Sequence, residues 1–308
     1  MKVTVLFAFA LLFAGNCRDN KGQNLLQEDY MQFSGSTPGD SIVKLILGIP
    51  VTDSIDFMKW DLIFRNDGRQ IFSLSINYGL ARPNTSGFKE NAGILTIKGE
   101  SKVTFKELGH FKDEVIHLIS DSFTNDTLSL VKLDNSLLHI LNPDYRLMVG
   151  NGGWSYTLNR TDESIDNSGS FHSLIPVDSI LSDSTFQMVF DGRTPCSEIA
   201  QTFGFSTNPD CLKLKWRIKL NWDPVTLKPT SYEIERTDIR STGSITGNWT
   251  ITILHGSAII FRLDPDKPDK SISFLVGDEN VLFFLDKNNR LFKGNKDFSY
   301  TVNRKNPV

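Results

Sequence analysis

The chain has 308 residues, of which 39% are hydrophobic, 22% charged and 11% aromatic, and its formal net charge is -3. This length is sufficient for two domains with packed cores. The composition is ordinary for a soluble protein, and its charge balance lacks the basic footprint expected of a nucleic-acid-binding surface.

The N-terminus carries the pattern of a secretory signal peptide over residues 1–16. Lys2 precedes an apolar run at residues 3–13 that is too short to span a bilayer, and small residues follow it. Cys17 then stands where a bacterial lipobox has its lipidated cysteine, so we expect cleavage before Cys17 and an acyl anchor on it. Simple secretion is the alternative. Arg18 avoids the aspartate that commonly retains lipoproteins at the inner membrane, which favours the outer membrane.

The polar composition of residues 17–39 predicts a flexible tether. We expect a first domain at residues 40–161, and a linker at residues 162–173, where the chain is acidic and polar. A second domain is expected at residues 174–306.

An internal repeat relates the two halves of the chain. Residues 128–160 align with residues 272–304 at a constant offset of 144 without a gap, and 13 of the 33 positions are identical. Both copies end in Ser-Tyr-Thr-x-Asn-Arg, closed by Arg160 and by Arg304. Because this spacing is far above the usual solenoid period, the repeating unit is a whole domain.

Each copy of the repeat consists of short apolar runs separated by Asx and Gly turns, which is typical of an antiparallel meander. Residues 154–158 alternate between apolar and polar side chains, so Trp154 and Tyr156 are expected on one inward face. Phe298 and Tyr300 are expected at the equivalent sites. The fold class predicted is therefore all-β, with two tandem antiparallel meander β-barrels.

Cys196 and Cys211 remain after Cys17, and an exported compartment favours a disulfide between them, closing a loop of about 15 residues. A metal or redox site is the alternative, although a C-x-x-C motif is missing. Residues 197–205 have helical spacing, with Ser197 as a candidate cap and Gly204 as a candidate end.

The first domain lacks both cysteines of this loop. Its connection at residues 52–58 also looks shorter than the connection in the second domain. We therefore expect the equivalent end of the first barrel to be more open, and to be the place for a ligand or partner.

No catalytic signature stands out. The five histidines do not pair at i, i+2 or i, i+4, and His139 aligns with Phe283, which favours a core position over a metal site. Asp264, Asp266 and Asp269 lack the glycine and glutamate of an EF-hand loop. We expect no metal, no cofactor and no enzymatic activity.

Residues 190–196, Phe-Asp-Gly-Arg-Thr-Pro-Cys, resemble the N-terminal domain of the lipoprotein NlpE, in which Gly-x-x-Pro-Cys is followed by a second cysteine. Residues 247–251 look like the Gly-x-Trp strand of that family, and residues 277–285 like its closing hairpin. The resemblance implies a small barrel related to lipocalins, and a link to copper homeostasis, envelope stress and surface sensing. Ile199 occupies the place of the family's second cysteine, so only Cys196 carries over.

Three functions follow as hypotheses. The first is a non-enzymatic envelope lipoprotein that senses or contacts a protein partner through barrel loops. The second is a lipocalin-like carrier of a small apolar ligand, and the third is copper or metal binding. An apolar cavity inside a barrel would favour the carrier, whereas filled barrels would favour the interaction protein.

Overall fold

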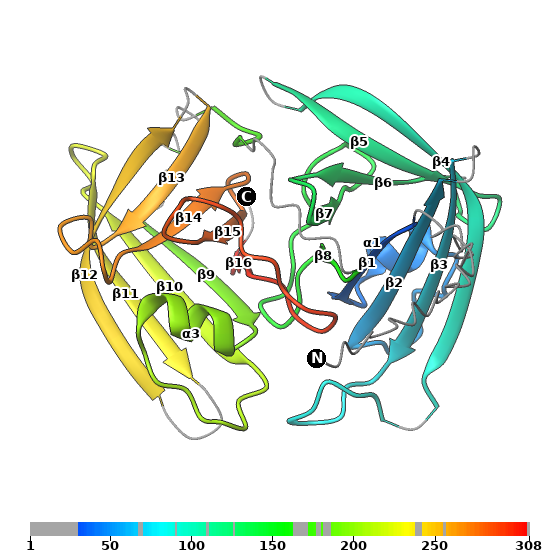
Figure 1. Cartoon of the computed structure of the whole chain (residues 1–308), viewed down its shortest axis with the longest axis horizontal. Helices are drawn as coiled ribbons and strands as arrows, with labels where there is room; N and C mark the ends of the chain where they lie inside the picture. The colour runs from blue at the N-terminus through cyan, green and yellow to red at the C-terminus, as the bar shows by residue number, and fades with distance from the viewer. Residues whose placement is uncertain are drawn as a thin grey trace, which may run out of the picture.

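Two closed, eight-stranded antiparallel barrels stand side by side in a computed structural model of the chain (Figure 1). Within each barrel every strand pairs with its neighbours in sequence, and the last strand pairs back onto the first. The all-β fold of two tandem meander barrels is thereby confirmed. The structure describes residues 30–66, 70–89, 91–108, 111–125, 127–162, 172–176, 180, 186–237, 242–254 and 257–306. The expected signal peptide and Cys17 lie outside these residues.

The first barrel contains one short helix, which follows its first strand. Its elements are β1 (Tyr30–Pro38), α1 (Ser41–Ile46), β2 (Phe57–Asn66), β3 (Gln70–Gly79), β4 (Gly93–Leu108), β5 (Phe111–Ile119), β6 (Thr127–Lys132), β7 (Leu137–Ile140) and β8 (Thr157–Arg160). The strands form here because apolar side chains alternate along them. In β3, for example, Phe72, Leu74 and Ile76 are buried in the barrel while their neighbours are more exposed.

The second barrel repeats this order, including a helix after its first strand. Its elements are β9 (Gln187–Thr194), α3 (Ser197–Phe203), β10 (Leu214–Trp222), β11 (Pro229–Thr237), β12 (Thr242–Leu254), β13 (Ala258–Leu263), β14 (Ile272–Val276), β15 (Val281–Leu285) and β16 (Thr301–Arg304). The two copies of the repeat have the same pairing, since His139 opposes Thr157 as Phe283 opposes Thr301.

The expected tether over residues 17–39 is wrong at its C-terminal end, because residues 30–38 form β1. This strand pairs with β2 and also with β8, and so closes the barrel. The sequence pattern did not reveal β1 because this strand contains few aliphatic residues. Gly35 allows β1 to approach β8 closely. A Cβ added at Gly35 would lie 2.8 Å from the carbonyl oxygen of Thr157, and one added at Gly192 would lie 2.8 Å from that of Thr301. The signal that could have revealed β1 is Gly-x-Thr-Pro, shared by residues 35–38 and 192–195.

The end of the linker contacts both barrels. His172 Nε2 lies 2.9 Å from Asp113 Oδ1 in β5. Ser173 Oγ accepts a hydrogen bond from the N–H of Ile259, and the N–H of Leu174 donates to the carbonyl of Gly277. Residues 172–174 therefore join β5 of the first barrel to β13 and the β14–β15 turn of the second.

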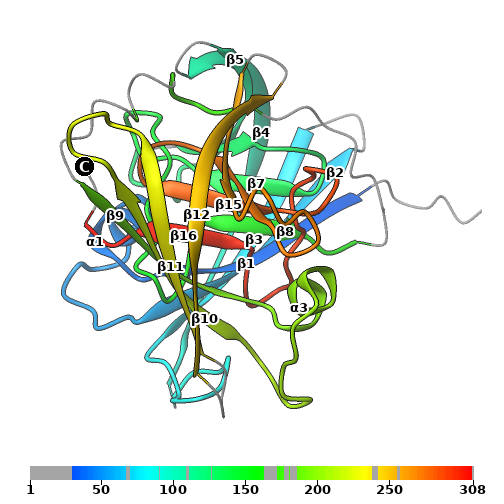
Figure 2. The ribbon, with the colours of Figure 1, turned by 90° about the vertical axis from the view of Figure 1, so that its left-hand side faces the viewer.

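The two barrels pack against each other through the two copies of the repeat, related by an approximate two-fold axis. Strands β7, β8, β15 and β16 lie at the centre of the molecule in Figure 1 and also in the turned view of Figure 2. Ser155 Oγ lies 2.6 Å from Ser299 Oγ, and Thr157 Oγ1 lies 2.9 Å from Thr301 Oγ1. In each pair the two residues are 144 positions apart in the sequence, which is the offset of the repeat.

A buried apolar cluster extends this contact and contains equivalent residues of both copies of the repeat. It combines residues of both barrels, among them Val131, Leu141, Leu147, Ile260, Phe283 and Leu291. Burial of apolar side chains is the main force that holds such an interface together. The pair of barrels therefore shares one core in addition to the core inside each barrel.

Candidate ligand pocket at the mouth of the first barrel

The interior of the second barrel is filled by aromatic rings. The rings of Trp249 and Phe261 lie 5.0 Å apart, and those of Phe274 and Phe284 lie 4.6 Å apart. Trp249 also donates a hydrogen bond from its indole N–H to the carbonyl of Asn221. Large rings of this kind leave little free volume inside an eight-stranded barrel.

The first barrel has smaller side chains at the corresponding sites. Ser101 opposes Leu118 in the β4–β5 pair, as Trp249 opposes Leu263 in the β12–β13 pair. By the same register, Ile116 takes the place of Phe261. Replacement of a tryptophan by a serine and of a phenylalanine by an isoleucine leaves space at this end of the first barrel.

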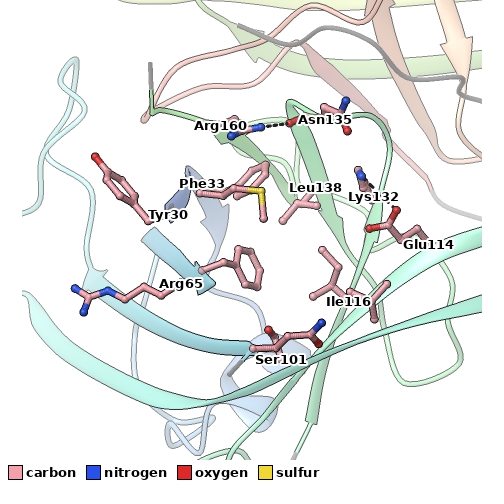
Figure 3. A pocket seen from close by; sticks show the side chains of 14 residues that line it. Tyr30, Phe33, Arg65, Ser101, Glu114, Ile116, Lys132, Asn135, Leu138 and Arg160 are labelled. Carbon is pink, nitrogen blue, oxygen red and sulfur yellow. Dashed lines mark hydrogen bonds and ion pairs between the residues drawn. The ribbon is translucent and has the colours of Figure 1, made fainter. Parts of the chain in front are cut away.

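This space is a cavity of about 380 Å³ that opens to solvent (Figure 3). Its apolar lining comes from five strands and comprises Met31, Phe33, Phe64, Val103, Ile116 and Leu138. Four of these side chains, Phe33, Phe64, Ile116 and Leu138, are buried. The volume falls in the range of small-molecule pockets, which are mostly apolar with a few placed polar groups.

Charged side chains surround the cavity, and cations outnumber carboxylates among them. Arg65, Lys132 and Arg160 line it together with Glu114. Lys132 Nζ lies 3.2 Å from Glu114 Oε2, while Arg65 is exposed and forms no ion pair with a described residue. Because Lys132 is paired with Glu114 and Arg160 with Asp162, Arg65 supplies the excess positive charge at the cavity, which favours an anionic group on a ligand.

Arg160 is held in place at the edge of the cavity. Its guanidinium donates three hydrogen bonds of 2.8 to 3.0 Å to the carboxylate of Asp162. Desolvation alone would raise the pKa of Asp162, but the hydrogen bonds and charge of Arg160 outweigh it and lower that pKa below its usual value. Arg304 occupies the equivalent place in the second barrel, where it donates to the carbonyl of Glu279.

Exposed apolar side chains continue the cavity lining outward. Tyr30, Met31 and Val103 line the cavity and remain substantially exposed. Phe105, two residues beyond Val103 on the same face of β4, is 71% exposed. Contiguous exposed apolar side chains of this kind are typical of a contact site for a ligand or a partner.

The helix predicted near the cysteines is present, and the disulfide between Cys196 and Cys211 is confirmed, with Cα atoms 6.0 Å apart. Because both sulfurs are bonded to each other, neither is a thiolate ligand in this state. Gly204 ends α3 in the left-handed conformation at φ 67°, as predicted. Ser197 is the first helical residue and not the cap, which is Cys196 without a side-chain capping bond.

The expectation of an open first barrel at the end near residues 52–58 is wrong. That connection also contains a helix, α1, whose start is capped by Asp40 through a 3.0 Å bond to the N–H of Val43. Tyr156 donates its hydroxyl to the same carboxylate, and Lys44 Nζ donates to the carbonyls of Val51 and Asp53. The cavity lies at the other end, where β1 begins and β2 ends.

Of the four aromatic residues predicted to face the barrel interiors, the two tyrosines do so and Trp154 does not. Tyr156 and Tyr300 are buried in the cores of their own barrels. Trp154 and Phe298 precede strands β8 and β16, which begin three residues later. Trp154 is half-buried and stacks on Phe57 with ring centroids 4.8 Å apart, whereas Phe298 is buried. The sequence indicated a turn at Asn151, but the alternation started the strand at Trp154. In the structure the Asn151 side chain accepts from the N–H groups of Gly153 and Trp154, so the turn extends to Trp154.

Comparison with known proteins gives no match to this chain, whether among protein-family models, curated proteins or solved structures. Among the described residues, no helix is long and apolar enough to cross a membrane. Within the same ranges, no cluster of three or more His, Cys, Asp or Glu side chains could hold a metal ion.

Proposed function

We propose that this protein is an exported, lipid-anchored binding protein that holds a small amphipathic ligand in the mouth of its first barrel. The ligand has an apolar body, which occupies the cavity, and an anionic head, which lies at Arg65 and the other cations of the lining. The observation that carries the proposal is the cavity itself, lined by buried apolar side chains and bordered by excess positive charge. Carriage of a ligand is non-enzymatic, and it requires neither a metal nor a cofactor.

The comparison between the two barrels supports this function. They share strand order and register, yet Trp249 and Phe261 fill the second barrel where Ser101 and Ile116 leave the first one hollow. Apolar side chains that line an unfilled cavity lack packing contacts, which reduces stability. A ligand that fills it would restore those contacts, which gives the hollow barrel a use that the filled barrel lacks.

The test is to fill the cavity from within. We expect Ser101→Trp to weaken binding of 1-anilinonaphthalene-8-sulfonate, an apolar anion whose fluorescence rises on burial, at least tenfold. The indole would enter the space that the Trp249 indole takes in the second barrel. Thr96→Trp is the matched control, because Thr96 lies on the exposed outer face of the same strand, and it should bind the probe like the wild type. Equal binding by Ser101→Trp and the wild type would remove the proposal.

Anchoring is tested separately at Cys17. The lipobox pattern of residues 14–17 supports an acyl chain on this cysteine, and we propose the outer membrane as the location. We expect Cys17→Ser to move the protein from the membrane fraction to the soluble fraction of the envelope, since a lipid anchor would then be missing. An unchanged distribution in membrane fractionation would contradict the lipid anchor.

Envelope sensing through a protein partner is the second candidate function. It is favoured by the exposed ring of Phe105, which lies on the same face of β4 as the cavity-lining Val103. Phe105→Ser distinguishes the two functions. A carrier with this variant should still bind the probe within a fewfold of the wild type, whereas a sensor should lose its partner, measured by crosslinking in intact cells.

A further inference from the structure

The approximate two-fold axis between the barrels creates two related grooves on the surface. The first groove, of about 390 Å³, is lined by Lys59, Trp60 and Asp297 among other residues. The second groove, of about 420 Å³, is lined by Gly153, Trp154, Arg193 and Lys215 among others. Each groove combines a strand of one barrel with the turn that precedes the last strand of the other barrel.

Lysines 59 and 215 occupy equivalent places in these grooves. Each directly precedes a tryptophan whose indole N–H donates to a threonine in the first strand of its barrel. Trp60 donates to Thr37 and Trp216 donates to Thr194, and both distances are 2.8 Å.

The turns that face these lysines are equivalent too. Asn295 Oδ1 accepts from the N–H groups of Asp297 and Phe298. Asn151 Oδ1 accepts in the same way from the N–H groups of Gly153 and Trp154. Gly153 therefore stands where the other turn has Asp297.

The two lysines differ in whether a carboxylate of the facing turn pairs with them. Lys59 Nζ lies 2.6 Å from Asp297 Oδ1, so the first groove contains its own carboxylate. Lys215 faces a turn with a glycine at that place, and it forms no ion pair with a described residue. The acidic residues of the second groove are already engaged, because Asp191 binds Arg217 at 2.9 Å and Glu235 binds Lys219 at 2.9 Å.

A second cation without a counter-charge lies in the same groove. Arg193 is half-buried, its guanidinium carbon lies 5.1 Å from the ring centroid of Trp154, and it has no ion pair with a described residue. Burial lowers the pKa of Arg193. Burial, and then the charges of Arg193 and Lys215, lower the pKa of neighbouring Lys213 to about 8. Partly buried cations that repel one another are stabilised by an anion between them.

We propose that the second groove is a binding site for a small carboxylate, held between Arg193 and Lys215 in the place that the Asp297 carboxylate takes in the first groove. The planar guanidinium of Arg193 matches a carboxylate through two parallel N–H···O bonds. Lys215, the cross-strand partner of Arg193 between β10 and β9, adds a point charge from the same wall of the groove. The site involves neither the cavity of the first barrel nor its ligand, so it is independent of the carrier function.

The test titrates the purified chain with acetate at constant ionic strength, balanced with sodium chloride, and follows the backbone amide signals of Gly152, Gly153 and Trp154 by NMR. We expect saturable shifts with a dissociation constant on the order of millimolar, as befits a ligand of four heavy atoms. Arg193→Ala should weaken acetate binding at least tenfold. Lys102→Ala, which removes an exposed lysine of the first barrel, should leave it unchanged.

A second variant supplies the missing carboxylate from the chain itself. A Cβ at Gly153 would lie 3.4 Å from Arg193 Cζ, and this glycine has an ordinary negative or extended φ. Gly153→Asp should therefore weaken acetate binding at least tenfold and raise the melting temperature. Gly153→Ala, with the same Cβ and no charge, should keep acetate binding within about twofold.

Three outcomes would overturn the proposal. Equal shifts with acetate and with chloride would show screening and not a site. Unchanged acetate binding by both Arg193→Ala and Gly153→Asp would place the site elsewhere. Saturable shifts with inorganic phosphate but none with acetate would show that the groove selects a different anion.

Discussion

Replacing Asn159 and Asn303 together by leucine should lower the free energy of unfolding by about 4 kcal/mol, taking roughly 2 kcal/mol for each broken set of buried hydrogen bonds. Asn159 Oδ1 accepts from the N–H of Gly294 at 2.8 Å, and its Nδ2 donates to the carbonyl of Asn295. Asn303 Oδ1 accepts from the N–H of Gly150 at 2.7 Å. Leucine has a similar size but cannot satisfy these backbone groups, which stay in the interface without a partner.

Denaturant unfolding followed by fluorescence and circular dichroism measures this change. The matched control is Asn288→Leu, an exposed asparagine in a turn of the second copy, which should alter stability by no more than about 0.5 kcal/mol. Since the two sites bridge the barrels, the double variant should also separate the unfolding of the two barrels into two transitions. A loss below about 1 kcal/mol would mean that the apolar contact alone holds the barrels together.

Acidification to below pH 4 should lower the free energy of unfolding by about 3 kcal/mol through protonation of His139. Burial lowers the pKa of His139 from 6.5 to about 4, although a hydrogen bond to the carbonyl of Met148 works against that shift. The ring is fully buried, with Nδ1 3.0 Å from Thr157 Oγ1 and Phe283 edge-on at 5.7 Å. Between pH 6.5 and 4 the unfolded chain binds this proton and the folded chain does not. Stability from this site is therefore complete above pH 6.5 and is lost as the pH falls toward 4.

The variant His139→Phe isolates this contribution, because the chain itself carries Phe283 at the related site. The difference in unfolding free energy between wild type and His139→Phe should grow by about 3 kcal/mol in favour of the wild type from pH 4 to pH 7. Broken hydrogen bonds shift this difference by a constant that does not depend on pH. A difference that stays flat over this range would show that His139 has the same pKa in the folded and unfolded states.

Asp278 provides a control of opposite sign. Burial raises its pKa from 3.8 to about 7, against the effect of its hydrogen bond from the N–H of Asn280. Its folded form therefore favours the proton, and stability from this site is lost as the pH rises from 3.8 through 7. Asp278→Asn keeps an acceptor for that N–H and removes the charge. As the pH rises from 4 to 7, the stability of Asp278→Asn relative to the wild type should rise, whereas the stability of His139→Phe relative to the wild type should fall.

The sequence by itself determined the features that depend on local pattern or on covalent chemistry. Two-residue alternation and Asx turns predicted the meander, and the gap-free repeat predicted two related barrels. The cysteine pair and the helix before Gly204 were also predicted, since spacing along the chain decides both. These predictions succeeded because each required only residues close together in sequence or a comparison of one segment with another.

The tertiary structure alone decided what covers each face. The alternation in Ser155, Thr157 and Asn159 indicated a polar face, yet this face packs on its own repeat, because hydroxyl and amide groups satisfy one another across the axis. Closure by β1 followed from pairing with a strand more than a hundred residues away, which its own sequence does not encode.

The cavity and the second groove also depended on tertiary structure, because each arises from a comparison of side-chain volumes or charges at sites brought together by strand register. Ser101 marks a cavity only once the register sets it against Trp249, and Gly153 marks a missing carboxylate only once it is set against Asp297. A strand's sequence shows which side chains share a face. Which neighbours fill or leave the space beside that face is a property of the assembled barrels.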